Sequence, residues 1–320
     1  MSTPTTPDPV ASPTTPDPAA SPTTPDPVAP DPMPASTRRN LLVETALVLG
    51  VSLGASAIWS LLRLIDLLTR QVALNAQTTT MNPSVTPDRP WLDLANQLVG
   101  IGLGVVPAVL ALHLLTTRPG HLPAIRGKNA EESARYYLES AEGEPKADGE
   151  PRANGKRSAY RLIGFDLRRP GRDLLTGLAL AALVGLPGLG LYLGARHLGF
   201  NTTIAAANLT AAWWTLPVLV LAAAQNAVLE EVVMIGYLFR RWAQAGWRPW
   251  AVIGVSALIR GGYHLYQGFG GFVGNAVMGV LFGWIYTRTR RVMPLVVAHT
   301  VLDVVAFVGY TLAKGHLTWL

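Results

Sequence analysis

The sequence predicts an all-α protein, a polytopic bundle of about seven transmembrane helices that follows a disordered, proline-rich N-terminal tail. Three observations predict this class. Of the 320 residues, 49% are hydrophobic and only 14% are charged, whereas soluble domains carry about 25% charged residues. The apolar residues are grouped into long runs, and most of these runs reach the ~20 residues that a helix needs to cross a bilayer. The beginning of the chain, in contrast, is rich in proline and contains little that is apolar.

Residues 1–37 form the predicted tail. A nine-residue unit, SPTTPDPAA, begins at Ser12 and returns as SPTTPDPVA at Ser21. Proline at this density excludes helix and sheet, and the segment has too little apolar surface to fold alone. It also lacks the basic start and the apolar stretch of a signal peptide, so we expect the first hydrophobic run to be a retained span.

Seven apolar segments follow the tail. They lie at about 41–69, 92–116, 174–195, 211–239, 250–266, 270–287 and 292–313. The first two form an N-terminal pair within residues 38–116, and a cytoplasmic connector is expected at 117–172. The other five belong to a predicted catalytic core at 173–320. Segments 250–266 and 270–287 are short and are joined by a glycine-rich turn, so we expect them to form a hairpin.

Positively charged residues flank these segments on one side. They precede the first segment, fill the connector, and follow the fourth and the sixth segments. With a cytoplasmic N-terminus and an external C-terminus, seven spans place all of these groups in the cytoplasm, in agreement with the positive-inside rule. We therefore expect a multi-pass plasma membrane protein, and the richness in Ala, Gly and Arg suggests a bacterial one. The charges form no stripe with exposed aromatics, so the expected partner is lipid and not nucleic acid.

Ionisable residues lie inside several of the last four segments. In sequence order they are Glu230, Glu231, Arg260, His264, His299 and Asp303. Each such group costs about 2.5–3.5 kcal/mol at the centre of a bilayer, which makes each a candidate functional residue. With a rise of ~1.5 Å per residue, the glutamates and both histidines come within about 8 Å of the bilayer midplane. We expect three helices to bring these side chains to one level.

This set of side chains suits hydrolysis. A desolvated glutamate beside a histidine can accept a proton from water and return it to a leaving amine. A second histidine and a hydrogen-bonding carboxyl group can stabilise the oxyanion. The set could equally hold a metal ion such as Zn²⁺, with Glu230, His264, His299 and Asp303 as ligands. The chain has no cysteine, which excludes thiolate zinc sites and cysteine nucleophiles.

Three motifs in these segments resemble a known family. They are Glu230-Glu231 followed by Gly236-Tyr237-Leu238, then His264, then His299-x-x-x-Asp303. Their order and membrane placement are similar to those of the CPBP family, the CAAX prenyl protease 2-type or Abi intramembrane endopeptidases, over about residues 174–313. The resemblance implies that Glu230 and His264 activate water and that His299 and Asp303 form the oxyanion site. It also implies a mechanism that requires no metal, and a membrane-anchored or lipid-modified peptide as substrate.

Two positions depart from the family pattern of EExxxR, FxxxH and HxxxN/D. Ile235 replaces the arginine of the first motif, and Arg260 replaces the phenylalanine of the second. A buried glutamate and a buried arginine are both expensive when unpaired, so we expect Arg260 to reach across and pair with Glu231. Asp303 can donate to an oxyanion only when protonated. As an anion it would fit better as a metal ligand or as the orienter of a histidine.

The remaining polar residues of the spans have structural as well as functional explanations. Asn226 suits a helix–helix contact or support of the site, and Asn275 suits a packing contact or a clamp on the substrate backbone. Glu44 and Asp66 lie near the ends of a predicted segment, where we expect them at the membrane interface.

Three function classes remain open. An intramembrane peptidase is favoured by the joint pattern of motifs. A catalytically inactive membrane scaffold or immunity protein is favoured by the departures at Ile235 and Arg260. A proton-coupled transporter is the third class, because buried carboxylates and histidines also form proton relays. Against the transporter stand the single polar cluster and the lack of an obvious inverted repeat.

Overall fold

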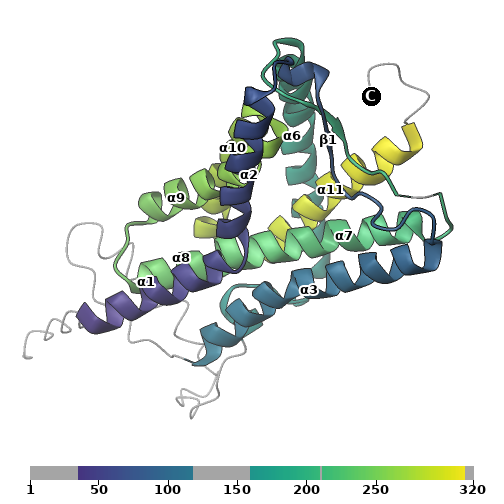
Figure 1. Cartoon of the computed structure of the whole chain (residues 1–320). Helices are drawn as coiled ribbons and strands as arrows, with labels where there is room; N and C mark the ends of the chain where they lie inside the picture. The colour runs from purple at the N-terminus through teal and green to yellow at the C-terminus, as the bar shows by residue number, and fades with distance from the viewer. Residues whose placement is uncertain (1–34, 118–158, 210, 314–320) are drawn as a thin grey trace, which may run out of the picture.

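The computed structural model describes residues 35–117, 159–209 and 211–313, which form a mostly helical membrane bundle (Figure 1). Five helices in these ranges are long and apolar enough to cross a bilayer. They are α3 (Pro90–Thr117), α6 (Pro170–His197), the continuous helix that joins α7 (Thr215–Glu230) to α8 (Leu238–Gln244), α10 (Phe269–Thr289) and α11 (Met293–Ala313). The prediction of a polytopic helix bundle is confirmed. The predicted tail, up to residue 34, and most of the predicted connector lie outside the described residues.

The first predicted segment, 41–69, is a bent pair of helices. α1 (Ala35–Gly50) and α2 (Leu53–Thr69) meet at 52°, and they add a sixth candidate span if the pair crosses the membrane as one unit. The bend falls at Ser52, which leaves helical geometry and donates its hydroxyl to the Val48 carbonyl at 2.6 Å. Gly50 lies two residues earlier, and glycine–serine pairs are a common cause of helix kinks. Hydropathy does not detect such a bend.

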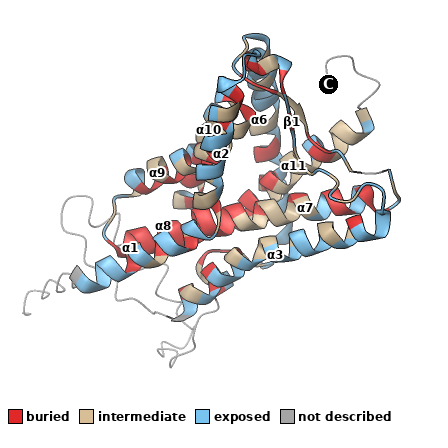
Figure 2. Cartoon of the chain, in the orientation of Figure 1, coloured by how far each residue is buried: buried red, intermediate tan, exposed pale blue. Residues whose placement is uncertain are grey.

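One long helix lies at the centre of the bundle. It runs from α7 through a π-helical segment, Glu231–Tyr237, into α8. In its most apolar stretch 56% of the residues are buried, against 17–28% in the other four spans, and its middle is the long red stretch of Figure 2. α3 lies along one side of α7, and α11 packs against both α7 and α6. Polar groups on such a helix need partners from its neighbours.

α9 (Pro249–Gly262) and α10 form the predicted hairpin. Two glycines allow the close approach, because a Cβ on Gly279 would lie 2.9 Å from Ala257 Cα and one on Gly261 would lie 2.8 Å from the Phe272 carbonyl oxygen. α9 has only 14 residues, about 21 Å of helix, which is short for a hydrocarbon core of ~30 Å. The described residues therefore give five or six candidate spans where the sequence predicts about seven.

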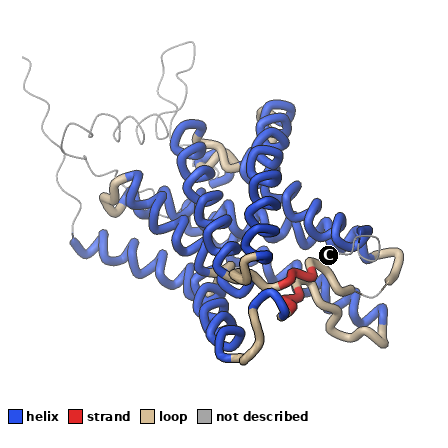
Figure 3. Tube along the Cα trace, turned by 90° about the horizontal axis from the view of Figure 1, so that it is seen from above, coloured by secondary structure: helices blue, strands red, loops and turns tan. Residues whose placement is uncertain are grey.

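A short parallel sheet, which the all-α prediction lacks, joins the segments after α2 and α6 (Figure 3). β1 (Thr78–Thr80) and β2 (Thr203–Ala205) pair with Thr78 opposite Thr203. Hydroxyl groups connect this sheet to the turn η3 (Leu265–Gln267): Thr202 donates to Thr79 Oγ1 at 2.9 Å, and Thr79 donates to the Tyr266 carbonyl at 3.2 Å. Three-residue strands are too short for a periodicity signal, yet these strands fix the segment that follows His264.

Arg291 ties together two of the basic segments. It lies between α10 and α11, and its guanidinium donates to Asp173 at 2.9 and 2.6 Å and to Asp166 at 3.0 Å. Asp166 and Asp173 lie just before and just inside α6, so the start of α6 and the α10–α11 turn lie at the same end of the bundle. This arrangement agrees with the sequence-based grouping of their positive charges on one side of the membrane.

We expect the Arg291–Asp166 pair to make stability depend on pH in acid. Burial acts to raise the pKa of Asp166, but hydrogen bonds from the Arg168 amide and the Arg291 guanidinium outweigh it, and this pKa lies below its ordinary value of 3.8. A group with a depressed pKa contributes stability above its unfolded-state pKa and loses that contribution as the pH falls through the folded-state value. Below about pH 4 the wild type should therefore lose more melting temperature in detergent than Asp166→Asn does. Equal losses in the two proteins would contradict this expectation.

Candidate active site

Glu230 and Glu231 occupy the middle of the central helix. Glu230 is the last residue of α7, and Glu231 begins the π-helical segment. Glu231 is completely buried and Glu230 nearly so, and a buried carboxylate must be paired or hydrogen-bonded. π-helical turns inside α-helices are often found at functional sites. This turn was not predicted, because hydropathy does not distinguish a π-helical turn from an α-helical one.

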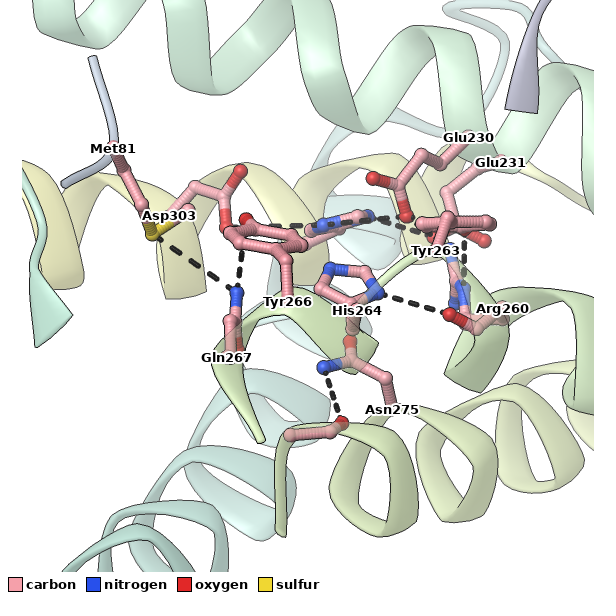
Figure 4. Close-up of polar contacts among 12 residues, drawn as sticks. Met81, Glu230, Glu231, Arg260, Tyr263, His264, Tyr266, Gln267, Asn275 and Asp303 are labelled. Carbon is pink, nitrogen blue, oxygen red and sulfur yellow. Dashed lines mark hydrogen bonds and ion pairs between the residues drawn. The ribbon is translucent and has the colours of Figure 1, made fainter. Parts of the chain in front are cut away.

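Arg260 of α9 lies against both glutamates (Figure 4). Its Nη2 atom donates to Glu231 Oε1 in a short hydrogen bond, and it lies 3.3 Å from Glu230 Oε2. The arginine side chain is 1% exposed, and its guanidinium carbon lies 5.6 Å from the centre of the Phe282 ring, within the range of a cation–π contact. The predicted pairing of Arg260 with Glu231 is confirmed, and the structure adds Glu230 as a second partner.

His299 of α11 lies close to the same two carboxylates. Its Nδ1 lies 2.8 Å from Glu231 Oε1. Because the carboxylate paired with Arg260 can only accept, the hydrogen of this contact lies on Nδ1. The other ring nitrogen, Nε2, lies 4.0 Å from Glu230 Oε2 and 3.8 Å from Asp303 Oδ1. Glu231 therefore orients the ring so that Nε2 faces the space between Glu230 and Asp303.

His264 lies just beyond the end of α9, where the chain leaves the helix. Its Nδ1 lies 3.0 Å from the carbonyl oxygen of Arg260. A carbonyl can only accept, so Nδ1 is the donor and Nε2 of the neutral ring is left as an acceptor. The rings of Tyr263 and Tyr266 lie on either side in the sequence and near the imidazole in space, with centroids 4.8 and 6.4 Å away. In Figure 4 the imidazole lies between Glu230, above it, and Asn275, below it.

Tyr263 also belongs to the cluster, and it was not predicted as a site residue. Its hydroxyl donates to Glu230 Oε2 at 2.7 Å and accepts from Arg260 Nε at 3.3 Å. A tyrosine near a predicted segment end looks like a membrane-interface residue, which hides this role. The available signal was its spacing, because Arg260 and Tyr263 are three residues apart and share a helix face.

The three other predicted residues surround this cluster. Asp303 of α11 is 21% exposed at its side chain and lies 3.8 Å from His299 Nε2. Asn226 lies in α7, one turn before Glu230. Asn275 lies below His264 in Figure 4 and donates to the Gly271 carbonyl of its own helix at 3.0 Å. That contact satisfies one amide hydrogen without reaching the glutamates.

Comparison with family models identifies this part of the chain. Residues 212–305 match the family described as type II CAAX prenyl endopeptidase Rce1-like. This segment is a domain of that family. The match begins before α7 and ends within α11, so it contains every residue of the cluster described above. Comparisons with curated proteins and with solved structures found no match.

The matched domain departs from the family pattern at two positions, and the two changes compensate each other in charge. Ile235, at the position of the missing arginine, is buried in the apolar core with Val232 and Tyr237. Arg260 supplies a guanidinium from the neighbouring helix, and its Nη2 reaches the same two glutamates. Compared with the family pattern, the positive charge moves from the π-helical segment of the central helix to α9, and it stays within the cluster. Loss of the family arginine therefore does not leave the glutamates without a cation.

The same side chains raise the question of whether the cluster could bind a metal ion. Among the described residues, no group of three or more His, Asp or Glu is placed so that it could hold a metal ion. Arg260 puts its positive charge beside Glu230 and Glu231, where a cation bound by the glutamates would be repelled. Glu231 holds His299 through Nδ1 and Arg260 through the same oxygen. The predicted alternative zinc ligands are Glu230, His264, His299 and Asp303, and the first of them already pairs with Arg260 at 3.3 Å.

Proposed function

We propose that this protein is an intramembrane endopeptidase that hydrolyses peptide bonds of membrane-associated substrates. The observation that carries the proposal is the buried cluster of Glu230, Glu231, Arg260 and His299 inside a CAAX endopeptidase family domain. Buried ion pairs stabilise a fold little, and apolar residues of similar size often replace them without loss. Four ionisable groups gathered in the middle of a membrane helix bundle therefore indicate a chemical role.

In the proposed reaction Glu230 and His264 activate a water molecule. Glu230 accepts a proton from water while the water oxygen bonds to the carbonyl carbon of the substrate, and the electron pair of the carbonyl moves to its oxygen. His264 Nε2, left free by the Nδ1 contact with the Arg260 carbonyl, holds the water beside Glu230. When the carbon–nitrogen bond breaks, Glu230 returns the proton to the leaving amine. The active site then differs from its starting state only by the bound products.

His299 and Asp303 are proposed to stabilise the oxyanion. When the His299 ring is doubly protonated, its Nε2 donates toward the space between Glu230 and Asp303, where the carbonyl oxygen would lie. Asp303 adds a second donor when it is protonated. Glu231 acts through His299, because it holds Nδ1 at 2.8 Å and is itself held by Arg260. Preorganised donors of this kind usually supply a large part of catalysis.

We propose that the reaction requires no metal ion or other cofactor. The support is chemical: Glu230 and His264 provide the base, His299 provides the electrophile, and Arg260 compensates the carboxylate charge that a metal would otherwise neutralise. Resistance of cleavage to a chelator is the expected result. Inhibition by a chelator that Zn²⁺ reverses would contradict this part of the proposal.

We propose membrane-anchored or lipid-modified peptides and proteins as the substrates. The support is the depth of the cluster within membrane helices and the family to which the domain belongs. The arginine-rich segments before α6 and between α10 and α11 lie at one end of the bundle, which supports a plasma membrane protein with that end and its N-terminus in the cytoplasm.

The test compares the wild type with Glu230→Gln and His264→Ala in liposomes. Each protein is incubated with a library of membrane-anchored peptides, with and without a chelator, and products are identified by mass spectrometry. We expect both substitutions to reduce cleavage by at least about 100-fold, because general base catalysis contributes about 10²–10⁴-fold. His113→Ala is the matched control, since His113 is an exposed histidine of α3 outside the cluster.

The other function classes predict different outcomes. A scaffold or immunity protein would show no cleavage, and its phenotype would survive Glu230→Gln. A proton-coupled transporter would move protons or substrate in a liposome with a pH gradient, and Glu230→Gln would stop that flux. Cleavage by wild type and His113→Ala, lost in both site variants, would establish the peptidase.

A further inference from the structure

Tyr263 contacts both Glu230 and His264, the two residues proposed to activate water. It lies at the C-terminal end of α9, and the residue is 5% exposed. Its hydroxyl reaches 33 positions back along the chain to donate to Glu230 Oε2 at 2.7 Å. The next residue is His264, whose ring centroid lies 4.8 Å from that of Tyr263. One side chain thus contacts the proposed base directly and lies against the histidine that works with it.

Two donors converge on a single oxygen of Glu230. Tyr263 donates to Oε2, and Arg260 Nη2 lies 3.3 Å from the same atom. Within the described part of the chain, the hydrogen bonds of this carboxylate all fall on Oε2. The terminal torsion of a glutamate is otherwise broad, so two donors on one oxygen restrict the rotation of the group. Oε1 is then the oxygen that remains for water.

Arg260 alone cannot give this result. Its Nη2 bonds more closely to Glu231 than to Glu230, so its main partner is the residue that orients His299. The Tyr263 hydroxyl also accepts from Arg260 Nε at 3.3 Å, which fixes the direction in which its own hydrogen points. The Tyr263 hydroxyl therefore bridges the Arg260 guanidinium and the Glu230 carboxylate.

We propose that Tyr263 is a positioning residue that holds Glu230 by Oε2 and presents Oε1 to the attacking water beside His264. This inference rests on the proposed peptidase function. The tyrosine takes no proton and makes no bond to substrate. Its contribution is to keep the base in one orientation, which lowers the cost of reaching the transition state without altering how substrate binds.

Tyr263→Phe removes the hydroxyl and keeps the ring. A hydrogen bond to a charged group corresponds to about a 10- to 100-fold effect, so kcat/KM should fall by that factor. The loss should appear in kcat, with KM changed by less than about twofold, because the bond acts on the base and not on the substrate. Tyr286→Phe is the matched control: Tyr286 is a buried tyrosine of α10 that packs edge-on against Phe239, and its variant should retain wild-type kcat. A wild-type kcat in Tyr263→Phe, or a loss confined to KM, would overturn the proposal.

A double-mutant cycle in melting temperature tests the contact without using activity. Tyr263→Phe should lower the melting temperature of the wild type more than that of Glu230→Leu, where the hydroxyl has already lost its acceptor and keeps only the contact from Arg260 Nε. Additive effects would overturn the proposed contact. If the wild type cleaves nothing, the peptidase proposal fails and the cycle alone decides whether Tyr263 holds Glu230. If the wild type cleaves and Tyr263→Phe cleaves equally well, the peptidase stands and the positioning role fails.

Discussion

Replacing Arg260 by leucine should destabilise the protein by about 3–5 kcal/mol and reduce cleavage to background. The substitution leaves Glu230 and Glu231 buried without their shared cation, and removal of one partner from a buried ion pair leaves an uncompensated charge. Activity should also fall because Glu231, which orients His299, then lacks its own hydrogen bond from Arg260. The measurements are the unfolding transition in detergent and the cleavage rate in liposomes.

A double variant that moves the arginine back to its family position tests the compensation hypothesis more directly. In Ile235→Arg/Arg260→Phe the cation returns to the central helix, one turn after Glu231, where the family pattern has it. We expect the double variant to recover part of the stability and activity that Arg260→Leu loses. Arg288→Leu is the control, because Arg288 is exposed and stacks on Trp284 outside the cluster. If Arg260→Leu folded and cleaved like Arg288→Leu, the compensation hypothesis would be wrong.

Glu44→Gln should cost about 3–5 kcal/mol of stability while leaving the buried cluster around Glu230 chemically intact. Glu44 was expected near the membrane interface, and the structure gives it a buried ion-pair partner. Glu44 Oε1 lies 2.8 Å from Arg241 Nε, with the arginine 1% exposed and the glutamate 12% exposed at their side chains. Tyr237 also donates to Glu44 at 2.9 Å. The pair connects α1 to α8, so its loss leaves Arg241 buried without a carboxylate.

An exposed ion pair of the same chain provides the control for Glu44→Gln. Asp66 pairs with Arg63 and Arg70, and the side chains of all three are 44–47% exposed. Exposed pairs contribute about 0–1 kcal/mol, so Asp66→Asn should have little effect on unfolding in detergent. Restoration of stability in Glu44→Leu/Arg241→Met would show that the buried charge causes the loss. A cost for Glu44→Gln no larger than that for Asp66→Asn would contradict the prediction.

The candidate site was largely predictable because charge inside a membrane is rare and expensive. Glu230, Glu231, Arg260 and His299 were recognised from their position within apolar runs, and the structure brings them together. The pairing of Arg260 with Glu231 followed from the cost of leaving either one alone. Tyr263 escaped because a hydroxyl group carries no such cost signal. Asn275 was expected as a packing contact or a substrate clamp, and in the structure its amide bonds to its own helix.

The helical membrane class, most of the spans and the candidate site residues could be predicted from the sequence alone. These follow from hydropathy and charge, which are properties of each segment taken alone. The folded structure was needed to reveal the bend at Ser52, the π-helical turn after Glu230, the β1–β2 pairing and the Tyr263–Glu230 hydrogen bond. The strand pairing and the hydrogen bond depend on how distant segments cross, whereas the bend and the turn are changes of helix geometry that hydropathy does not report. Tyr263 and Glu230 meet because glycines let α9 pack closely on α10 and because α9 also contacts the π-helical segment and α8, and that geometry has no local signature along the chain.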